Sequence, residues 1–122
     1  MFKIYITGLF KNCKNLTKLD IENFETNKVI DMSKMFMGCK NIQNLNVSKF
    51  NTENVIDMSY MFSECNSLIS INLDNFKTNK VIYMQSMFMD CYNVTKLDIS
   101  KLVVNKVIDI NNMFLIVYHL QN

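Results

Sequence analysis

The segment MFMGCKNIQNLNVSKFNTENVIDMSY, residues 35–60, decides the fold, because the next 26 residues repeat its pattern as MFSECNSLISINLDNFKTNKVIYMQS. The same frame sets four cysteines and five phenylalanines one period apart, namely Cys13, Cys39, Cys65, Cys91, Phe10, Phe36, Phe62, Phe88 and Phe114. A fixed period of about 20–50 residues is typical of stacked repeats, in which each unit buries its apolar face against its neighbours. We therefore expect a solenoid with 26 residues per turn.

The repeat also divides the chain. We expect a single repeat domain over residues 1–122, with a partial unit 1–8, full units 9–34, 35–60, 61–86 and 87–112, and a degenerate or truncated unit 113–122. Residues 1–8 fit the end of a unit, so we predict no signal peptide there. The chain starts and stops inside repeats and shows no polar caps. We therefore expect self-stacking through the uncapped ends, or mobile termini.

The charged composition argues against a nucleic-acid partner. The net charge is only +2, and apart from His119 every basic residue is a lysine. Arginine, the usual residue for bidentate contacts to phosphate and guanine, is missing. Counterion release would therefore contribute little affinity. No stretch approaches the roughly 20 continuous apolar residues that span a bilayer, so no membrane span is expected in this chain.

Two segments of each unit are predicted to form short strands. The L-x-x-L-x-L pattern of residues 16–21 recurs at 42–47, 68–73 and 94–99, and it points alternate apolar residues inward. The V-x-x-M pattern of residues 29–32 recurs at 55–58, 81–84 and 107–110, with its ends facing inward. Phe36 and Cys39 lie three residues apart, the spacing of one face of a helical turn, which predicts a short helical or 3-10 corner.

The frame M-F-x-x-C-x-x-L-x-x-L-x-L-S-x-F-x-T-x-x-V-x-x-M, as in residues 35–58, resembles the BspA-like leucine-rich repeats, also described as a mycoplasma lipoprotein-associated repeat family. The resemblance covers nearly the whole chain. It implies a leucine-rich-repeat solenoid, a β-rich α/β repeat of stacked parallel short strands. It also implies a surface or secreted protein linked to adhesion and protein binding, with no catalytic residues and no cofactor.

The cysteine column raises three alternatives. Zinc needs four ligands that converge on one point, whereas a 26-residue spacing sets these thiols in a line, so we expect no metal. Disulfides between neighbouring turns remain open, because stacked cysteines fall in the permitted distance range. The favoured interpretation is a structural ladder of small buried thiols beside the Phe36, Phe62 and Phe88 rings.

The remaining polar columns suggest structural roles. The only histidine, His119, lies in the degenerate unit, and no catalytic triad can be assembled around it. Asp31, Asp57 and Asp109 share a column with Tyr83, and we expect these carboxylates to cap their own turns, with cation binding as the alternative. Asn15, Asn41, Ser67 and Asn93 form a further column that could satisfy backbone groups at each corner.

Binding is expected on the outward columns. Two polar columns flank the predicted inward residues of the first strand, and they could bind a protein or glycan or could simply be solvated: Lys18, Asn44, Ser70 and Lys96, then Asp20, Asn46, Asn72 and Asp98. A third column holds Ile30, Ile56, Ile82 and Ile108. If it points outward it forms an apolar stripe of the kind that marks interfaces; alternatively the segment twists and the isoleucines point inward.

The sequence thus predicts a non-enzymatic interaction or adhesion module that presents a repeat surface to a protein or glycan partner. The alternative is a structural spacer, or a fragment of a larger surface repeat protein, without a ligand of its own.

Overall fold

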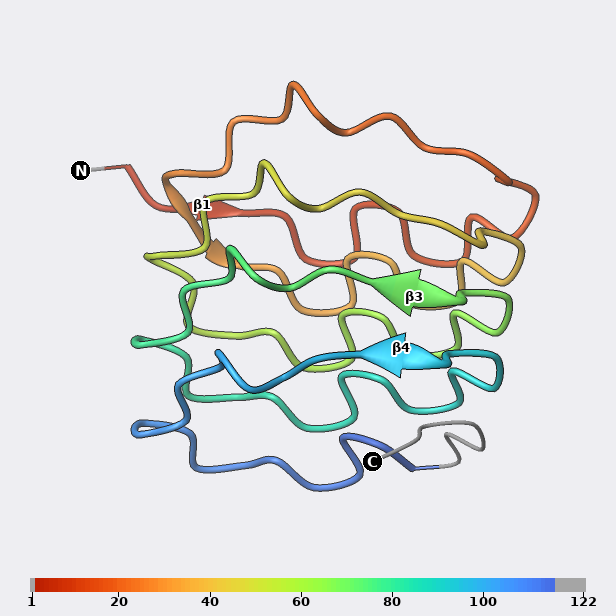
Figure 1. The fold of residues 1–122 in the computed structure, drawn as a ribbon. Coiled ribbons are helices and arrows are strands. Elements are labelled where there is room, and N and C mark those ends of the chain that lie inside the picture. Colours follow the sequence, from red (N-terminus) through yellow and green to blue (C-terminus); the bar gives the residue numbers. More distant parts are fainter. Residues whose placement is uncertain (1, 116–122) are drawn as a thin grey trace.

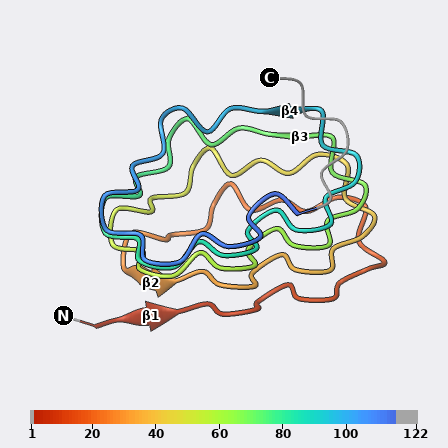
Figure 2. The same ribbon diagram turned by 90° about the horizontal axis from the view of Figure 1, so that it is seen from below.

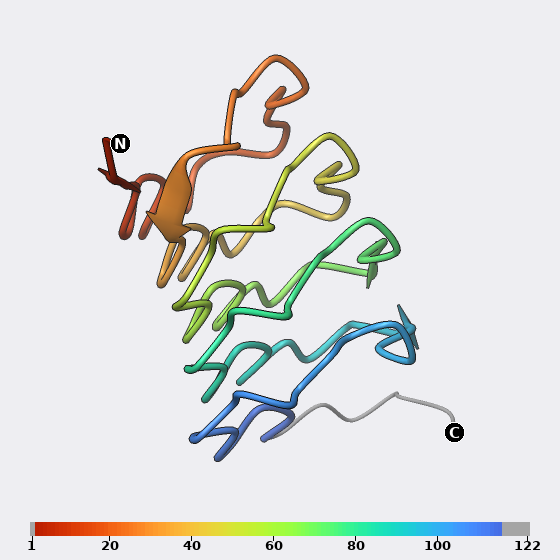
Figure 3. The same cartoon turned by 90° about the vertical axis from the view of Figure 1, so that its left-hand side faces the viewer.

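In the computed structural model the chain winds in successive turns that stack on one another (Figure 1). The structure describes residues 2–115, so His119 and most of the predicted last unit, 113–122, lie outside the described residues. Figure 3 shows the turns following one another from the N-terminal to the C-terminal end of the stack. Backbone hydrogen bonds join each turn to the next, for example from the Phe36 amide to the Met61 carbonyl at 2.9 Å.

The strands are short and pair in parallel. The structure assigns β1 (Ile4–Tyr5), β2 (Val29–Asp31), β3 (Ser70–Ile71) and β4 (Lys96–Leu97), in two sheets of two strands each. Strand β1 pairs with β2, and β3 pairs with β4, both in parallel register. The predicted parallel pairing of short strands is therefore confirmed, although the strands are shorter than the sequence patterns.

The two sheets lie on opposite long sides of each turn. Viewed along the stack, β1 and β2 follow one side and β3 and β4 follow the other (Figure 2). Isolated parallel bridges extend both sides: Asn44 pairs with Ser70 on the β3–β4 side, and Asp31, Asp57, Tyr83 and Asp109 pair in succession on the β1–β2 side. We call the β3–β4 side the strand face and the β1–β2 side the isoleucine wall.

The corner that carries Phe36 and Cys39 differs from the prediction. The described residues contain no helix, and residues 33–38 form a run of turns. Alternate amides take different partners here: Met37 donates to Lys34 within the turn at 3.2 Å, whereas Gly38 donates to Ser63 in the next turn at 2.9 Å. A helix needs consecutive local bonds, so this alternation explains why the predicted helical or 3-10 corner does not form.

Positive φ values make this alternation possible. Lys34, Tyr60 and Ser86 have φ of 58°, 57° and 56° at one position of the corner, and Gly38 has 77° at another. Such values are uncommon outside glycine, asparagine and aspartate. Glycine at position 38 also removes a clash, because an added Cβ would collide with the Asn12 Oδ1 atom.

The core lies between the two sides. Phe36, Phe62 and Phe88 are fully buried, and their rings stack on one another with centroids 5.7 and 5.3 Å apart. Both ends of the second motif point inward as predicted, since Val55 and Met58 are fully buried. Burial of a large apolar side chain contributes about 1.5–3 kcal/mol, so the ladder accounts for much of the cohesion between turns.

Candidate interaction surfaces

The two predicted polar columns lie together on the strand face. A shallow groove of about 450 Å³ is lined by both columns, from Lys18 and Asp20 through Asn44 to Asn72. A second groove of about 420 Å³ continues past Lys96 and Asp98, and the two share Ser70, Ile71 and Asn72. The structure therefore brings all eight of these residues into one continuous surface.

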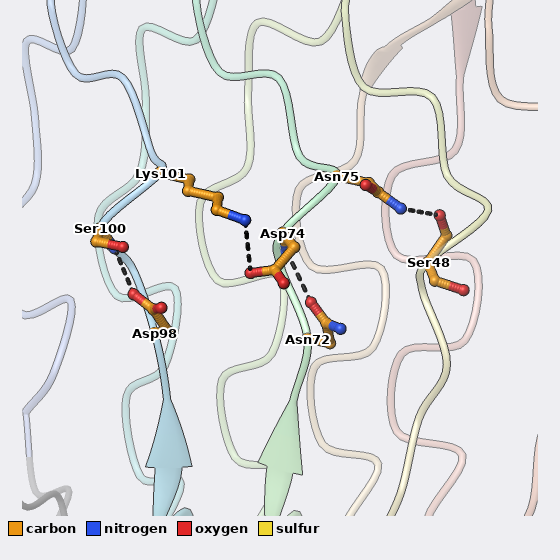
Figure 4. Close-up of polar contacts among 7 residues, drawn as sticks. All are labelled: Ser48, Asn72, Asp74, Asn75, Asp98, Ser100 and Lys101. Carbon is orange, nitrogen blue, oxygen red and sulfur yellow. Dashed lines mark hydrogen bonds and ion pairs between the residues drawn. The ribbon is translucent and has the colours of Figure 1, made fainter.

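The second of these columns has a structural role that sequence reasoning missed. The Oδ1 atoms of Asp20, Asn46, Asn72 and Asp98 each accept the amide two residues later, at 3.2, 3.0, 2.8 and 2.8 Å. These are Asx turns, which bend the chain after the strand. A signal was present, because every member of the column is Asp or Asn. Figure 4 shows the turns at Asn72 and Asp98.

The Asx turn also alters the acidity of Asp98. The Ser100 hydroxyl and amide donate to this carboxylate and lower the pKa of Asp98 below its ordinary value, with a smaller contribution from Lys101. Hydrogen bonds to the ionised form favour that form. Asp98 is thus a fixed negative charge at one end of the groove.

The first column is available for binding. Within residues 2–115 the side chains of Lys18, Asn44, Ser70 and Lys96 make no hydrogen bond or ion pair. The middle of the column, Asn44 and Ser70, is uncharged, and the two lysines lie at its ends. Amides and hydroxyls that face water without internal partners can bind hydrogen-bonding groups of a protein or a glycan.

Contacts between turns lie beside the second groove, which Asp74 lines. The Lys101 Nζ atom lies 3.7 Å from the Asp74 Oδ1 atom, and the Asn75 amide group donates to the Ser48 carbonyl at 3.0 Å (Figure 4). Both contacts cross from one turn to the next. An exposed ion pair contributes about 0–1 kcal/mol, so the pair between Lys101 and Asp74 adds little to the stability of the stack.

The isoleucine column lies on the opposite wall. Val55 and Met58 point inward, whereas Ile56 and Ile108 are 36% and 73% exposed, and Ile30 and Ile82 are half-buried. Their backbones form a ladder, from the Ile56 amide to Ile30, from Ile82 to Ile56 and from Ile108 to Ile82, at 2.8, 2.8 and 2.9 Å. The isoleucines therefore form an outward stripe, and the inward alternative does not hold.

The carboxylates beside this stripe cap their turns. Asp31 accepts from the Ser33 amide and hydroxyl at 2.8 and 2.6 Å, and Asp57 accepts in the same way from Ser59 at 2.8 and 2.7 Å. Asp109 accepts from the Asn111 amide at 3.0 Å. The predicted capping role is thus confirmed for all three carboxylates.

The cysteines form a ladder of hydrogen-bonded thiols. Cys39, Cys65 and Cys91 are buried, and their Sγ atoms donate to the carbonyls of Phe10, Phe36 and Phe62 at 3.2, 3.2 and 3.0 Å. Burial is the main cause that raises the pKa of Cys39 to about 11 and that of Cys91 to about 12. Cys13 is only partly buried, and all four thiols are free.

Neither a metal site nor a membrane helix is found in the described part of the chain. No group of three or more His, Cys, Asp or Glu side chains there could hold a metal ion. No helix within residues 2–115 has the length and apolar character needed to cross a bilayer.

The asparagine column satisfies backbone groups as expected at two corners. The Asn41 side-chain amide donates to the Lys14 carbonyl, and Asn93 donates to the Asn66 carbonyl at 2.7 Å. Sequence reasoning missed a second polar ladder. Thr26, Thr52 and Thr78 are buried, and each hydroxyl bridges to the backbone of the next turn; the Thr52 Oγ1 atom donates to the Lys77 carbonyl at 3.0 Å and accepts from its amide at 2.8 Å. Their 26-residue recurrence was the available signal.

The chain was compared with models of known protein families. A family model described as "Mycoplasma protein of unknown function, DUF285" matches residues 5–122. No curated protein and no solved structure matches the chain.

Proposed function

The chain belongs to the family described as Mycoplasma protein of unknown function, DUF285, and from this premise we propose that it is a non-enzymatic interaction module that binds a protein or glycan partner on its strand face. The finer classification is part of the proposal. The stacked turns are a leucine-rich-repeat solenoid of the BspA-like type, and the module acts in adhesion at the cell surface or after secretion.

One observation carries the proposal. The strand face combines a continuous groove with a column whose side chains at Lys18, Asn44, Ser70 and Lys96 are uncommitted within the described residues. The recurring acidic and thiol groups are in contrast tied to the backbone, as at Asp57 and Cys65. Groups so engaged support a structural role, and the uncommitted column supports binding.

The experiment places a bulky cation in the middle of the groove. Two single variants of the chain, Asn44→Arg and Ser70→Arg, are each tested against immobilised extracellular-matrix proteins and an array of neutral, sialylated and sulfated oligosaccharides. The matched control is Asn79→Arg, an exposed asparagine outside both grooves. We expect the groove variants to lose at least tenfold in affinity and the control to bind as the wild type. Equal affinity of all three chains would contradict the proposal.

A structural spacer is the second candidate, and a specific observation favours it. Half of the predicted polar surface, the column from Asp20 to Asp98, is engaged in Asx turns. A spacer would bind nothing on either panel while keeping the stability of the stack. Absence of any ligand for the wild-type chain on both panels would support this candidate over the interaction module.

A further inference from the structure

The isoleucine wall carries three parallel columns of different chemistry. Ile30, Ile56, Ile82 and Ile108 form the central stripe, as described above. Two positions before each isoleucine stands a mostly basic column, Lys28, Asn54, Lys80 and Lys106. One position after each isoleucine stands a mostly acidic column, Asp31, Asp57, Tyr83 and Asp109. An apolar stripe therefore runs along the stack between a basic edge and an acidic edge.

All three columns face outward. Lys28 lies in the turn immediately before β2, and Asn54, Lys80 and Lys106 lie in the equivalent turns, so the basic column borders the isoleucine stripe where each turn enters this wall. Val29 and Met32 are buried, which leaves Ile30 and Asp31 on the outer side between them. Lys28, Lys80 and Lys106 are exposed, and Tyr83 is exposed as well.

Charged groups on both edges can still form hydrogen bonds and ion pairs with a partner. Among the described residues the Lys28 and Lys106 ammonium groups have no ion-pair partner, and Lys80 donates only to the Asn54 side chain at 2.9 Å. The capping bonds of Asp31, Asp57 and Asp109 all end on Oδ1, which leaves the second carboxylate oxygen of each free to accept. Both edges can therefore contact a partner without breaking the turns.

We propose that this wall pairs with the same wall of a second copy of the chain, about a two-fold axis that runs parallel to the stack. This rotation exchanges the two edges, so that each basic column faces the partner's acidic column and the isoleucine stripes meet in the middle. The symmetry also aligns equal turns, so that Lys28 faces the partner's Asp31 and Lys106 faces the partner's Asp109. Such an interface is isologous and closes at two copies.

Charge selects this orientation over the other face-to-face arrangement. A two-fold axis along the strands would keep each column on its own side and set lysines against lysines and aspartates against aspartates. Like charges in an interface disfavour the wrong arrangement, whereas complementary columns fix orientation and register. A membrane surface fits less well, because the acidic column would face the anionic lipids that the lysines attract.

The first experiment tests the apolar stripe. Sedimentation velocity over a wide range of concentrations is measured for the wild type, Ile56→Lys and Ile69→Lys. Ile69 is a matched control, since it is 40% exposed against 36% for Ile56 and lies on the strand side, where its amide pairs with Gln43. We expect a wild-type dimer, at least a hundredfold weaker dimerisation for Ile56→Lys, and no change for Ile69→Lys.

The second experiment tests the orientation by exchanging charges. Lys106→Glu and Asp109→Lys are prepared as separate chains, and circular dichroism confirms that both are folded. In a homodimer of either variant, residues of like charge face each other at both copies of this contact. We therefore expect each variant on its own to dimerise about tenfold more weakly than the wild type. When the two chains are mixed, the introduced carboxylate of one chain faces the introduced ammonium group of the other. The native pair between Asp109 of the first chain and Lys106 of the second is kept, so the heterodimer regains wild-type affinity.

The outcomes separate this pairing from other associations. A monomer at all concentrations, a dimer indifferent to Ile56→Lys, or a mixture without preference for the heterodimer would each overturn the proposal. Growth beyond two copies with rising concentration would also overturn it, because end-to-end stacking has no closing symmetry. The strand face remains free in the proposed dimer, so loss of ligand binding and loss of pairing are measured independently.

Discussion

The turn of residues 61–86 and the turn of residues 87–112 share one sequence frame, yet they are buried to different degrees. Leu73 and Met84 are 2% and 0% exposed, whereas Ile99 and Ile110, at the same two positions one period later, are 38% and 48% exposed. The earlier turn has a fully described turn on either side of it. The difference teaches that an apolar side chain of this repeat is buried by its neighbouring turns and not by its own.

The largest effect is expected where a ring has neighbours on both sides. Phe62 is fully buried between Phe36 and Phe88, whereas Phe10 is only partly buried. Phe62→Ala should lower the free energy of unfolding by about 3–5 kcal/mol, as large-to-small core substitutions do, and Phe10→Ala should cost about half as much. Urea denaturation measures both. Equal losses would contradict the comparison, since they would show that a ring stacked on each side adds no stability.

The thiol ladder predicts a loss of stability at alkaline pH. Burial raises the pKa of Cys39 to about 11, that of Cys91 to about 12, and that of Cys65 well above 9.0. The unfolded thiols ionise first as pH rises, so their contribution is fully present below about pH 9 and is lost as pH rises toward the folded values. Thermal unfolding between pH 7 and pH 11 should show this decline.

The rate at which each cysteine is alkylated also compares the end of the stack with its middle. Cys13 is partly buried in the first turn, whereas Cys65 lies in the middle of the stack. Iodoacetamide at pH 8.5, followed by mass spectrometry, should label Cys13 first and Cys65 only as the chain unfolds. Equal labelling rates at the two sites under native conditions would contradict the buried ladder.

Much of this fold could be predicted because the repeat is nearly free of insertions. The period alone places Phe62, Met58 and Cys65 in the core. The helical corner could not be excluded from the sequence, because the three-residue spacing of Phe36 and Cys39 suits both a helix and a run of turns. The choice depends on whether the intervening amides bond locally or to the next turn, as Gly38 does with Ser63.

The candidate surfaces were harder to separate by role. The columns of Asn44 and Asn46 look alike as outward polar positions, yet only Asn46 caps the chain after its strand. An Asp-or-Asn column indicates Asx turns, whereas a column mixing Lys, Asn and Ser indicates no shared structural role. The sequence left the direction of Ile56 open, because hydrophobic periodicity does not say which residues between the inward Val55 and Met58 face outward.

The threonine ladder gives an effect of intermediate size. Thr52→Val removes a buried hydroxyl that contacts both the amide and the carbonyl of Lys77, and we expect a loss of about 1–3 kcal/mol because both groups lose a partner. Val104 occupies the same position two periods later and is 48% exposed. Val104→Thr is therefore the matched control and should change the stability by less than about 0.5 kcal/mol. A similar effect at both positions would contradict the dependence on neighbouring turns.

The smallest effect should be a gain. Ser63 is fully buried, and within the described residues its hydroxyl has no hydrogen-bond partner. A buried unpaired hydroxyl is costly, so Ser63→Ala should raise the free energy of unfolding by about 1 kcal/mol. Ser59→Ala is the contrasting change, because the Ser59 hydroxyl donates to Asp57 at 2.7 Å, and its removal should cost about 1 kcal/mol. Loss of stability in both alanine variants would contradict this contrast, because it would show that the Ser63 hydroxyl is as well paired as the Ser59 hydroxyl.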